Sequence, residues 1–245
     1  MICAITFVTL YGSVALGALL YLENKYEQSQ SRVTKIRARR DAMERALDMM
    51  NFANAVIATI SSSIVLFTME SNERTDVRGK THSTELAKWT VESVCAYLFI
   101  EMTVLSVSSF RLPKTSWDWV KKCYGEMMAF HIVAFIGLTS VLLTGVGYPV
   151  AMWVIWSELT SIFLGIETFL EVFQLHDTST YYAVRICGTG AFVFQRVLIF
   201  FYLLWQCLVQ FTMDLLFIVQ FVILAGGTAL NVVIAWSMIS SCKSS

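Results

Sequence analysis

The apolar stretch of residues 148–173 contains one carboxylate near its middle, and this combination limits the folds that the chain can adopt. The stretch is long enough to cross a bilayer, because a transmembrane helix needs about 20 predominantly apolar residues. A charge at the depth of Glu158 costs roughly 2.5–3.5 kcal/mol on insertion scales unless it faces a packed interior or a wet cavity. Glu158 therefore needs partners on other helices, and the sequence predicts a helical bundle around it.

The composition agrees with a membrane bundle. Hydrophobic residues make up 56% of the chain, charged residues 15%, and there are only two prolines, which is outside the range of an ordinary soluble domain. We therefore expect an all-α, polytopic membrane protein. About seven transmembrane helices are predicted. One is the stretch around Glu158, and the other six lie at approximately residues 1–22, 46–69, 89–110, 124–143, 182–208 and 215–239.

The first apolar segment, residues 1–22, is too long for the apolar part of a signal peptide and is expected to be a retained span. A basic amphipathic connection, residues 23–45, follows it. This connection is either a solvated approach to the second helix or a contact for anionic lipid or a partner protein. The residues that would make such a contact are Arg32, Lys35, Arg37, Arg39 and Arg40.

Basic residues concentrate in the loops after the first, third and fifth spans. By the positive-inside rule, the N-terminus is expected outside, and the short tail of residues 241–245 is expected on the cytosolic or matrix side. The net charge of zero gives no indication of a nucleic-acid partner. The six cysteines are scattered singly, so we expect no metal site.

Polar residues inside the predicted spans are the candidate functional residues. Glu101, His131, Arg196 and Asn231 join Glu158 in positions that are costly on a lipid-facing surface. Pairing of Arg196 with Glu158 would cancel most of the cost of both charges, and we expect this pair in preference to Arg196 with Glu101. The pair would either fix the register of the helices or contact a ligand, and the residues alone leave both roles open.

Five segments resemble the motifs of the TLC-domain superfamily, which includes ceramide synthases, translocon-associated membrane proteins and small lipid-homeostasis proteins. Residues 96–101 resemble the "GYFxxD" segment of the family, with Glu101 in place of Asp. Residues 128–133 are similar to its histidine segment, and residues 157–164 to its "ELSTPFLN" segment. Residues 192–196 resemble its "F…R" segment, and residues 230–236 its terminal "LNxxW" segment.

This resemblance implies a TLC-like, barrel-like bundle of about six helices over residues 46–240, with a partly polar interior that holds a lipid chain or head group. The interior polar residues would be Tyr97, Glu101, His131, Glu158, Ser161, Arg196 and Asn231. The chain has one histidine, His131, where the family usually has two adjacent ones. We therefore expect a protein that is not an enzyme, and lipid N-acyl transfer remains a minor alternative.

Two classes of function follow. In the first, the protein binds or organises lipid in the bundle interior, with no cofactor other than a bound phospholipid or another lipid. In the second, it is a structural accessory subunit of a large membrane complex, such as a respiratory-chain or ATP-synthase complex. The membrane would be that of the endoplasmic reticulum or the mitochondrial inner membrane.

Overall fold

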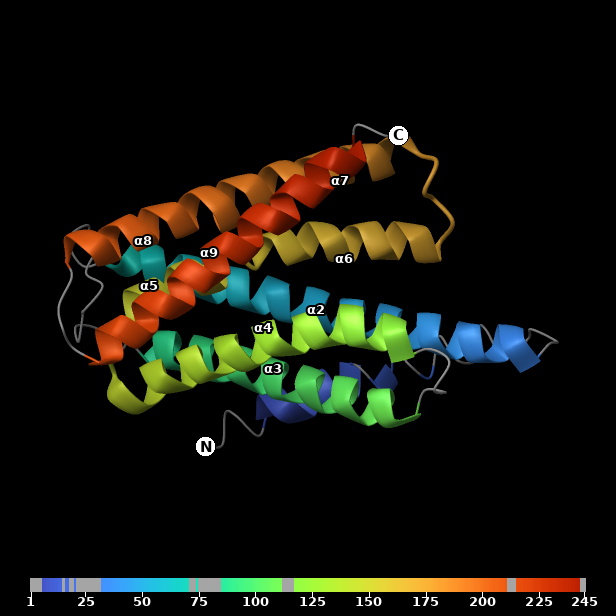
Figure 1. Cartoon of the computed structure of the whole chain (residues 1–245), viewed down its shortest axis with the longest axis horizontal. Coiled ribbons are helices and arrows are strands. Elements are labelled where there is room, and N and C mark those ends of the chain that lie inside the picture. The colour runs from blue at the N-terminus through green and yellow to red at the C-terminus, as the bar shows by residue number, and fades with distance from the viewer. Residues whose placement is uncertain are drawn as a thin grey trace.

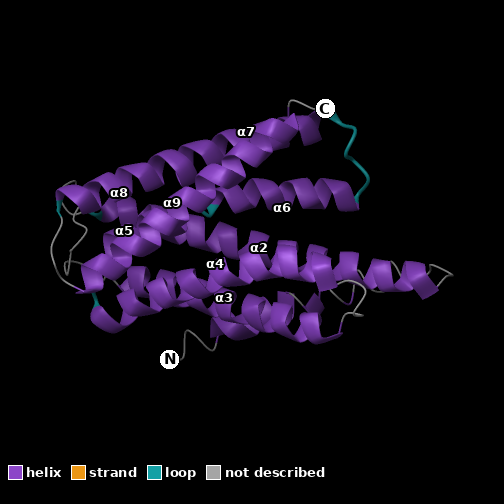
Figure 2. Ribbon diagram, in the orientation of Figure 1, coloured by secondary structure: helices purple, strands orange, loops and turns teal. Residues whose placement is uncertain are grey.

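The computed structural model of the chain describes residues 6–14, 16–17, 20, 32–70, 74, 85–111, 117–210 and 215–242. Within these ranges, side chains are described except at residues 32–44, 107–111, 117–127, 129, 215–216 and 237–242. The described chain is all helical, as Figure 2 shows. The helices are α2 (Arg32–Thr68), α3 (Glu85–Arg111), α4 (Trp117–Thr144), α5 (Tyr148–Trp156), α6 (Leu159–Val172), α7 (Ser179–Phe192), the π-helix η2 (Val193–Ile199), α8 (Phe200–Val209) and α9 (Leu215–Cys242).

The long helices run back and forth along one axis of the molecule (Figure 1). α2 lies in the middle of the bundle and contacts α3, α5 and α6. α5 and α6 follow one another along one line, as do α7, η2 and α8. α9 crosses the bundle and contacts α4, α7, η2 and α8.

A helical segment of residues 6–14 packs against this bundle through Tyr11, which is fully buried. The Tyr11 hydroxyl donates to Oδ1 of Asn54 on α2 at 3.2 Å and lies 2.8 Å from the hydroxyl of Ser93 on α3. A buried hydroxyl needs such partners, because an unsatisfied one carries the full cost of desolvation. Tyr11 therefore ties the first helical segment to the two helices that form the centre of the bundle.

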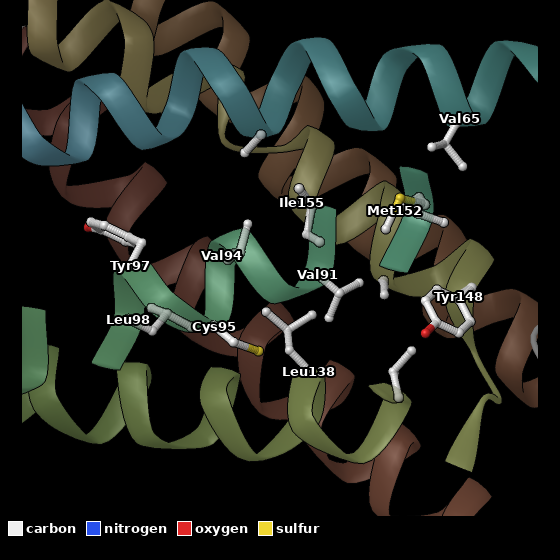
Figure 3. Close-up of a cluster of buried hydrophobic side chains, with 14 of the residues drawn as sticks. Val65, Val91, Val94, Cys95, Tyr97, Leu98, Leu138, Tyr148, Met152 and Ile155 are labelled. Carbon is white, nitrogen blue, oxygen red and sulfur yellow. The ribbon is translucent and has the colours of Figure 1, made fainter. Parts of the chain in front are cut away.

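Apolar side chains fill the space between α2, α3, α4 and α5 (Figure 3). Val91 and Val94 of α3 belong to this cluster together with Met152 and Ile155 of α5, and all four are buried. Large apolar side chains also cover the outside of the molecule, among them Phe67 at 80% exposure. Exposed apolar side chains of this size on most of the described helices are typical of a surface that faces lipid.

The all-helical, polytopic architecture expected from the sequence is confirmed. Within the described chain, four segments are long and apolar enough to cross a membrane: Arg45–Thr68, Tyr148–Val172, Ser179–Val209 and Phe217–Trp236. α4 contains a shorter apolar helix, Phe130–Thr144. α3 and α4 lie alongside the longer apolar helices in the same bundle.

Two predicted spans differ from the uninterrupted helices expected from the sequence. The fifth is interrupted at Ser157 and Glu158, where a turn separates α5 from α6. The sixth changes from α-helix to π-helix at Val193 and returns to α-helix at Phe200. The hydropathy of the sequence does not reveal either irregularity, because a kinked or π-helical segment is as apolar as a regular helix. Both irregularities carry residues of the candidate site.

Candidate functional site

The interruption between α5 and α6 brings four polar residues together. The backbone amides of Glu158, Thr160 and Ser161 each bond to the carbonyl three residues earlier, at 3.0, 3.3 and 2.8 Å. This pattern is that of a tightened 3₁₀ turn, which frequently marks a functional or strained position within a helix. The polar side chains of this turn thereby lie close together at the start of α6, and Ser157 and Thr160 are among its buried members.

Arg196 faces this turn from the π-helical segment η2. Its Nη2 donates to Oε1 of Glu158 at 2.9 Å and lies 3.4 Å from the hydroxyl of Ser161. Its Nε donates to Oγ1 of Thr160 at 3.0 Å, and the carbonyl oxygen of Ser157 lies 3.5 Å away. The expected pairing of Arg196 with Glu158 is thus confirmed, and Arg196 also contacts three neighbours of that carboxylate.

The second carboxylate oxygen of Glu158 is bonded as well, because the Ser161 hydroxyl donates to Oε2 at 2.7 Å. The side chains of Arg196 and Glu158 remain 15% and 22% exposed. An ion pair in such a setting is stable only if its remaining hydrogen-bonding groups are also satisfied. The serine and threonine hydroxyls of the turn supply these hydrogen bonds. The ion pair is therefore well hydrogen-bonded, and its side chains are still partly exposed.

A second acid–base pair connects α3 to α4. Nε2 of His131 lies 3.3 Å from Oε2 of Glu101, and both side chains are almost fully enclosed. The contact has the distance of an ion pair without the geometry of a hydrogen bond, and Nδ1 of His131 has no hydrogen-bond partner among the described residues. Tyr97, one turn before Glu101, hydrogen-bonds the same carboxylate.

The two pairs belong to one cluster. The charges of Glu158 and Arg196 act electrostatically on Tyr97 and on His131, and the charge of Glu158 acts on Glu101. Residues from α3, α4, the α5–α6 turn and η2 therefore lie within electrostatic range of one another inside the bundle. These residues are among those that the sequence predicts for the interior of the bundle, together with Asn231.

Asn231 is 1% exposed, and neither its amide nitrogen nor its amide oxygen has a hydrogen-bond partner in the described chain. Its position along the bundle follows from the packing of α9 against the antiparallel α8. A Cβ added at Gly227 would lie 3.3 Å from the Phe200 ring. One turn before Phe200 comes Arg196, and one turn after Gly227 comes Asn231. Asn231 thus lies at the level of the ion pair.

Sequence reasoning did not identify Ser157, Thr160 or Gln195 as site residues. Gln195 precedes Arg196 in η2, is 2% exposed, and its Oε1 has no hydrogen-bond partner in the part of the chain described. Ser157 and Thr160 flank the carboxylate in the sequence, so their proximity to Glu158 could have singled them out. Gln195 gives no comparable signal, because its orientation depends on the π-helical winding.

The predicted basic contact residues lie in the first turns of α2, which the structure describes as backbone only. The side chains of Arg32, Lys35, Arg37, Arg39 and Arg40 are therefore outside the described residues. Among the residues that are described, no group of three or more His, Cys, Asp or Glu side chains is arranged to hold a metal ion.

These features define an integral membrane protein with an all-helical bundle and a polar cluster in its interior. The sequence model of the TLC-domain family matches residues 46–240 of the chain. Since this match covers most of the chain, the protein belongs to the TLC-domain family, which indicates a lipid-related function in a membrane. A search of curated proteins finds no matching sequence.

Proposed function

We propose that the protein binds or organises a membrane lipid at the polar cluster of its bundle, without catalysing a reaction on it. Membership of a lipid-related family supports this function. The observation that carries the proposal is the ion pair of Arg196 and Glu158, a complete pair of charges that is still partly exposed within an apolar bundle. Charged groups inside membrane spans are retained mainly where they bind, move or orient something.

The contacts of the cluster favour binding over catalysis. A hydroxyl nucleophile needs an adjacent general base that accepts its proton. The Ser161 hydroxyl instead donates to Glu158, a carboxylate already held by Arg196, and the Ser157 hydroxyl donates to the carbonyl of Val154 at 2.6 Å. His131 contacts Glu101, whose carboxylate is hydrogen-bonded by Tyr97, and no hydrogen bond of the described residues aligns His131 or Glu101 with a serine or threonine hydroxyl of the cluster. N-acyl transfer stays the minor alternative.

The role of an accessory subunit is the second candidate, and the length of α2 favours it. α2 begins at Arg32, whereas its membrane-spanning part begins at Arg45. The helix therefore carries its basic turns away from the apolar bundle, where a partner subunit or anionic lipid would meet them. The membrane of the endoplasmic reticulum or the mitochondrial inner membrane is the proposed location, with the N-terminus outside.

Native mass spectrometry of the protein, extracted in mild detergent, tests lipid binding. We expect the wild-type chain to retain one lipid and the double variant Arg196→Leu/Glu158→Leu to lose it, because the polar anchor is then gone. The matched control is Glu167→Gln/Arg185→Gln, which removes a more distant pair on α6 and α7, 4.0 Å apart in the structure. We expect this control to keep its lipid.

Two results would contradict the proposal. One is a folded, monodisperse wild-type chain that carries no lipid in native spectra or lipid extracts. The other is loss of lipid from the control variant to the same extent as from the double variant. Co-purification of stoichiometric protein partners, lost when Arg37, Arg39 and Arg40 are changed to Gln, would instead support the accessory-subunit function.

A further inference from the structure

We propose that the lipid head group bound at this site is uncharged and carries both a hydroxyl and a carbonyl group, which pair with the side-chain amides of Gln195 and Asn231. This inference rests on the proposed function and specifies its ligand. It follows from the hydrogen-bonding capacity that the cluster leaves unused and from the balance of its charges.

The unused capacity includes two buried amides at one level of the bundle, besides Oε2 of Glu101 and Nδ1 of His131, which belong to the pair between α3 and α4. Asn231 offers an unpaired donor, Nδ2, and an unpaired acceptor, Oδ1, and Gln195 offers the unpaired acceptor Oε1 within the described chain. Buried polar groups are nearly always hydrogen-bonded, and each one left unpaired costs about 1–3 kcal/mol. A ligand with a hydroxyl donor and a carbonyl acceptor would satisfy groups of both kinds.

The charge balance argues against an anionic head group. The positive charge of Arg196 is already neutralised by Glu158 at 2.9 Å, and the Ser161 and Thr160 hydroxyls occupy further positions around the pair. The next ionisable groups are Glu101 and His131, which face each other. A phosphate would thus meet no unpaired cation at this level, and a buried charge without a partner is strongly disfavoured.

The π-helical segment places Gln195 close to the surrounding lipid. Phe194 and Leu198, on either side of Gln195 and Arg196 in η2, are each 55% exposed. Gln195 lies on the inner side of the same short segment at 2% exposure. A lipid in the outer apolar layer is therefore separated from Gln195 by the thickness of η2. The partly exposed Arg196 and Glu158 mark the side from which a head group reaches the amides.

The test compares two lipids that have the same acyl chains. The full-length protein in detergent is titrated with dioleoylglycerol and with dioleoylphosphatidic acid, which differ by the phosphate, and bound lipid is quantified by native mass spectrometry. We expect dioleoylglycerol to bind at least about tenfold more tightly. We further expect the variants Gln195→Met and Asn231→Leu each to weaken its binding by about tenfold, as loss of a buried hydrogen bond predicts.

Thr228→Val is the matched control. Thr228 is buried on α9 one turn before Asn231, and its hydroxyl is already bonded to the carbonyl of Leu224 at 2.7 Å, so the affinity for dioleoylglycerol should not change. Equal or tighter binding of dioleoylphosphatidic acid by the wild-type chain would overturn the inference without any variant. So would unchanged affinity in both amide variants. Binding of neither lipid would also overturn the inference, whereas the proposed function itself is decided by whether the wild-type chain retains a native lipid.

Discussion

Arg196 directs its guanidinium group toward four acceptors that lie within five consecutive residues, from Ser157 to Ser161. A guanidinium group has five N–H donors in a fixed planar arrangement, whereas a lysine ammonium is a compact point charge. Only an arginine therefore contacts a carboxylate, two hydroxyls and a carbonyl at the same time. The specificity of this position lies in the shape of the side chain as much as in its charge.

Removal of Arg196 alone should be strongly destabilising. Arg196→Leu leaves Glu158 as an unpaired charge inside the bundle, and we expect the free energy of unfolding to fall by about 3–5 kcal/mol. The double variant Arg196→Leu/Glu158→Leu should recover most of this loss, because no charge is then left buried. Equilibrium unfolding in mixed micelles measures both, and a double variant less stable than Arg196→Leu would contradict the account.

Part of the site could be predicted at this scale. A carboxylate and an arginine in apolar stretches need each other energetically, so Glu158 and Arg196 could be paired without a structure. Gln195 could not be identified, because its burial depends on a π-helical winding that has no signature in the pattern of apolar residues.

At the scale of the helices, close contacts through glycine set the distance between α2 and α6. Gly165 of α6 lies so near Phe52 of α2 that an added Cβ would be 2.5 Å from the phenylalanine ring. Small residues allow helix backbones to approach closely in membrane proteins. This approach brings α6, and with it the Glu158 turn, against the centre of the bundle.

Gly165→Ala should therefore destabilise the protein by about 1–3 kcal/mol through overpacking. Gly190→Ala is the matched control, because Gly190 lies within α7 and nothing is within 4 Å of an added Cβ. Alanine is the better helix former, so this control should be neutral or stabilising by up to about 1 kcal/mol. Thermal unfolding of both variants in the same detergent compares them. Equal melting temperatures for the two would show that the contact with Phe52 does not limit packing.

The helices themselves could be predicted, and their irregularities could not. Hydropathy identifies α2, α9 and the apolar lengths that contain α5 to α8, because crossing a bilayer requires a long apolar segment. The turn at Ser157 and Glu158 replaces α-helical hydrogen bonds with 3₁₀ bonds over a few residues, and it contains neither glycine nor proline. Such a change depends on tertiary contacts, here those of Arg196.

At the scale of the whole molecule, the two ends of the bundle are distinct. The loop that follows α6 lies at the same end as the first turns of α2, and the Gly145–Gly147 turn lies at the opposite end (Figure 1). The backbone of Gly147 has a φ of +86°, which allows α5 to reverse direction directly after α4. The basic residues of the sequence predict which end faces the cytosol or matrix.

Labelling with a membrane-impermeant maleimide tests this orientation. In a chain whose native cysteines are replaced by alanine, Asp177→Cys should react from the cytosolic or matrix side, because it lies in the loop after α6. Thr144→Cys, at the end of α4, should react only from the other side. Both positions are exposed. Permeabilised vesicles provide the control, and the reverse pattern would contradict the predicted orientation.

The unbroken course of α2 has a further consequence for its basic end. Residues 32–44 precede the membrane-spanning part of the helix, and at 1.5 Å per residue they extend it by about 20 Å. The first turns of α2 project past the ends of the neighbouring helices (Figure 1). A rigid, positively charged rod of this height is suited to an acidic surface on another protein.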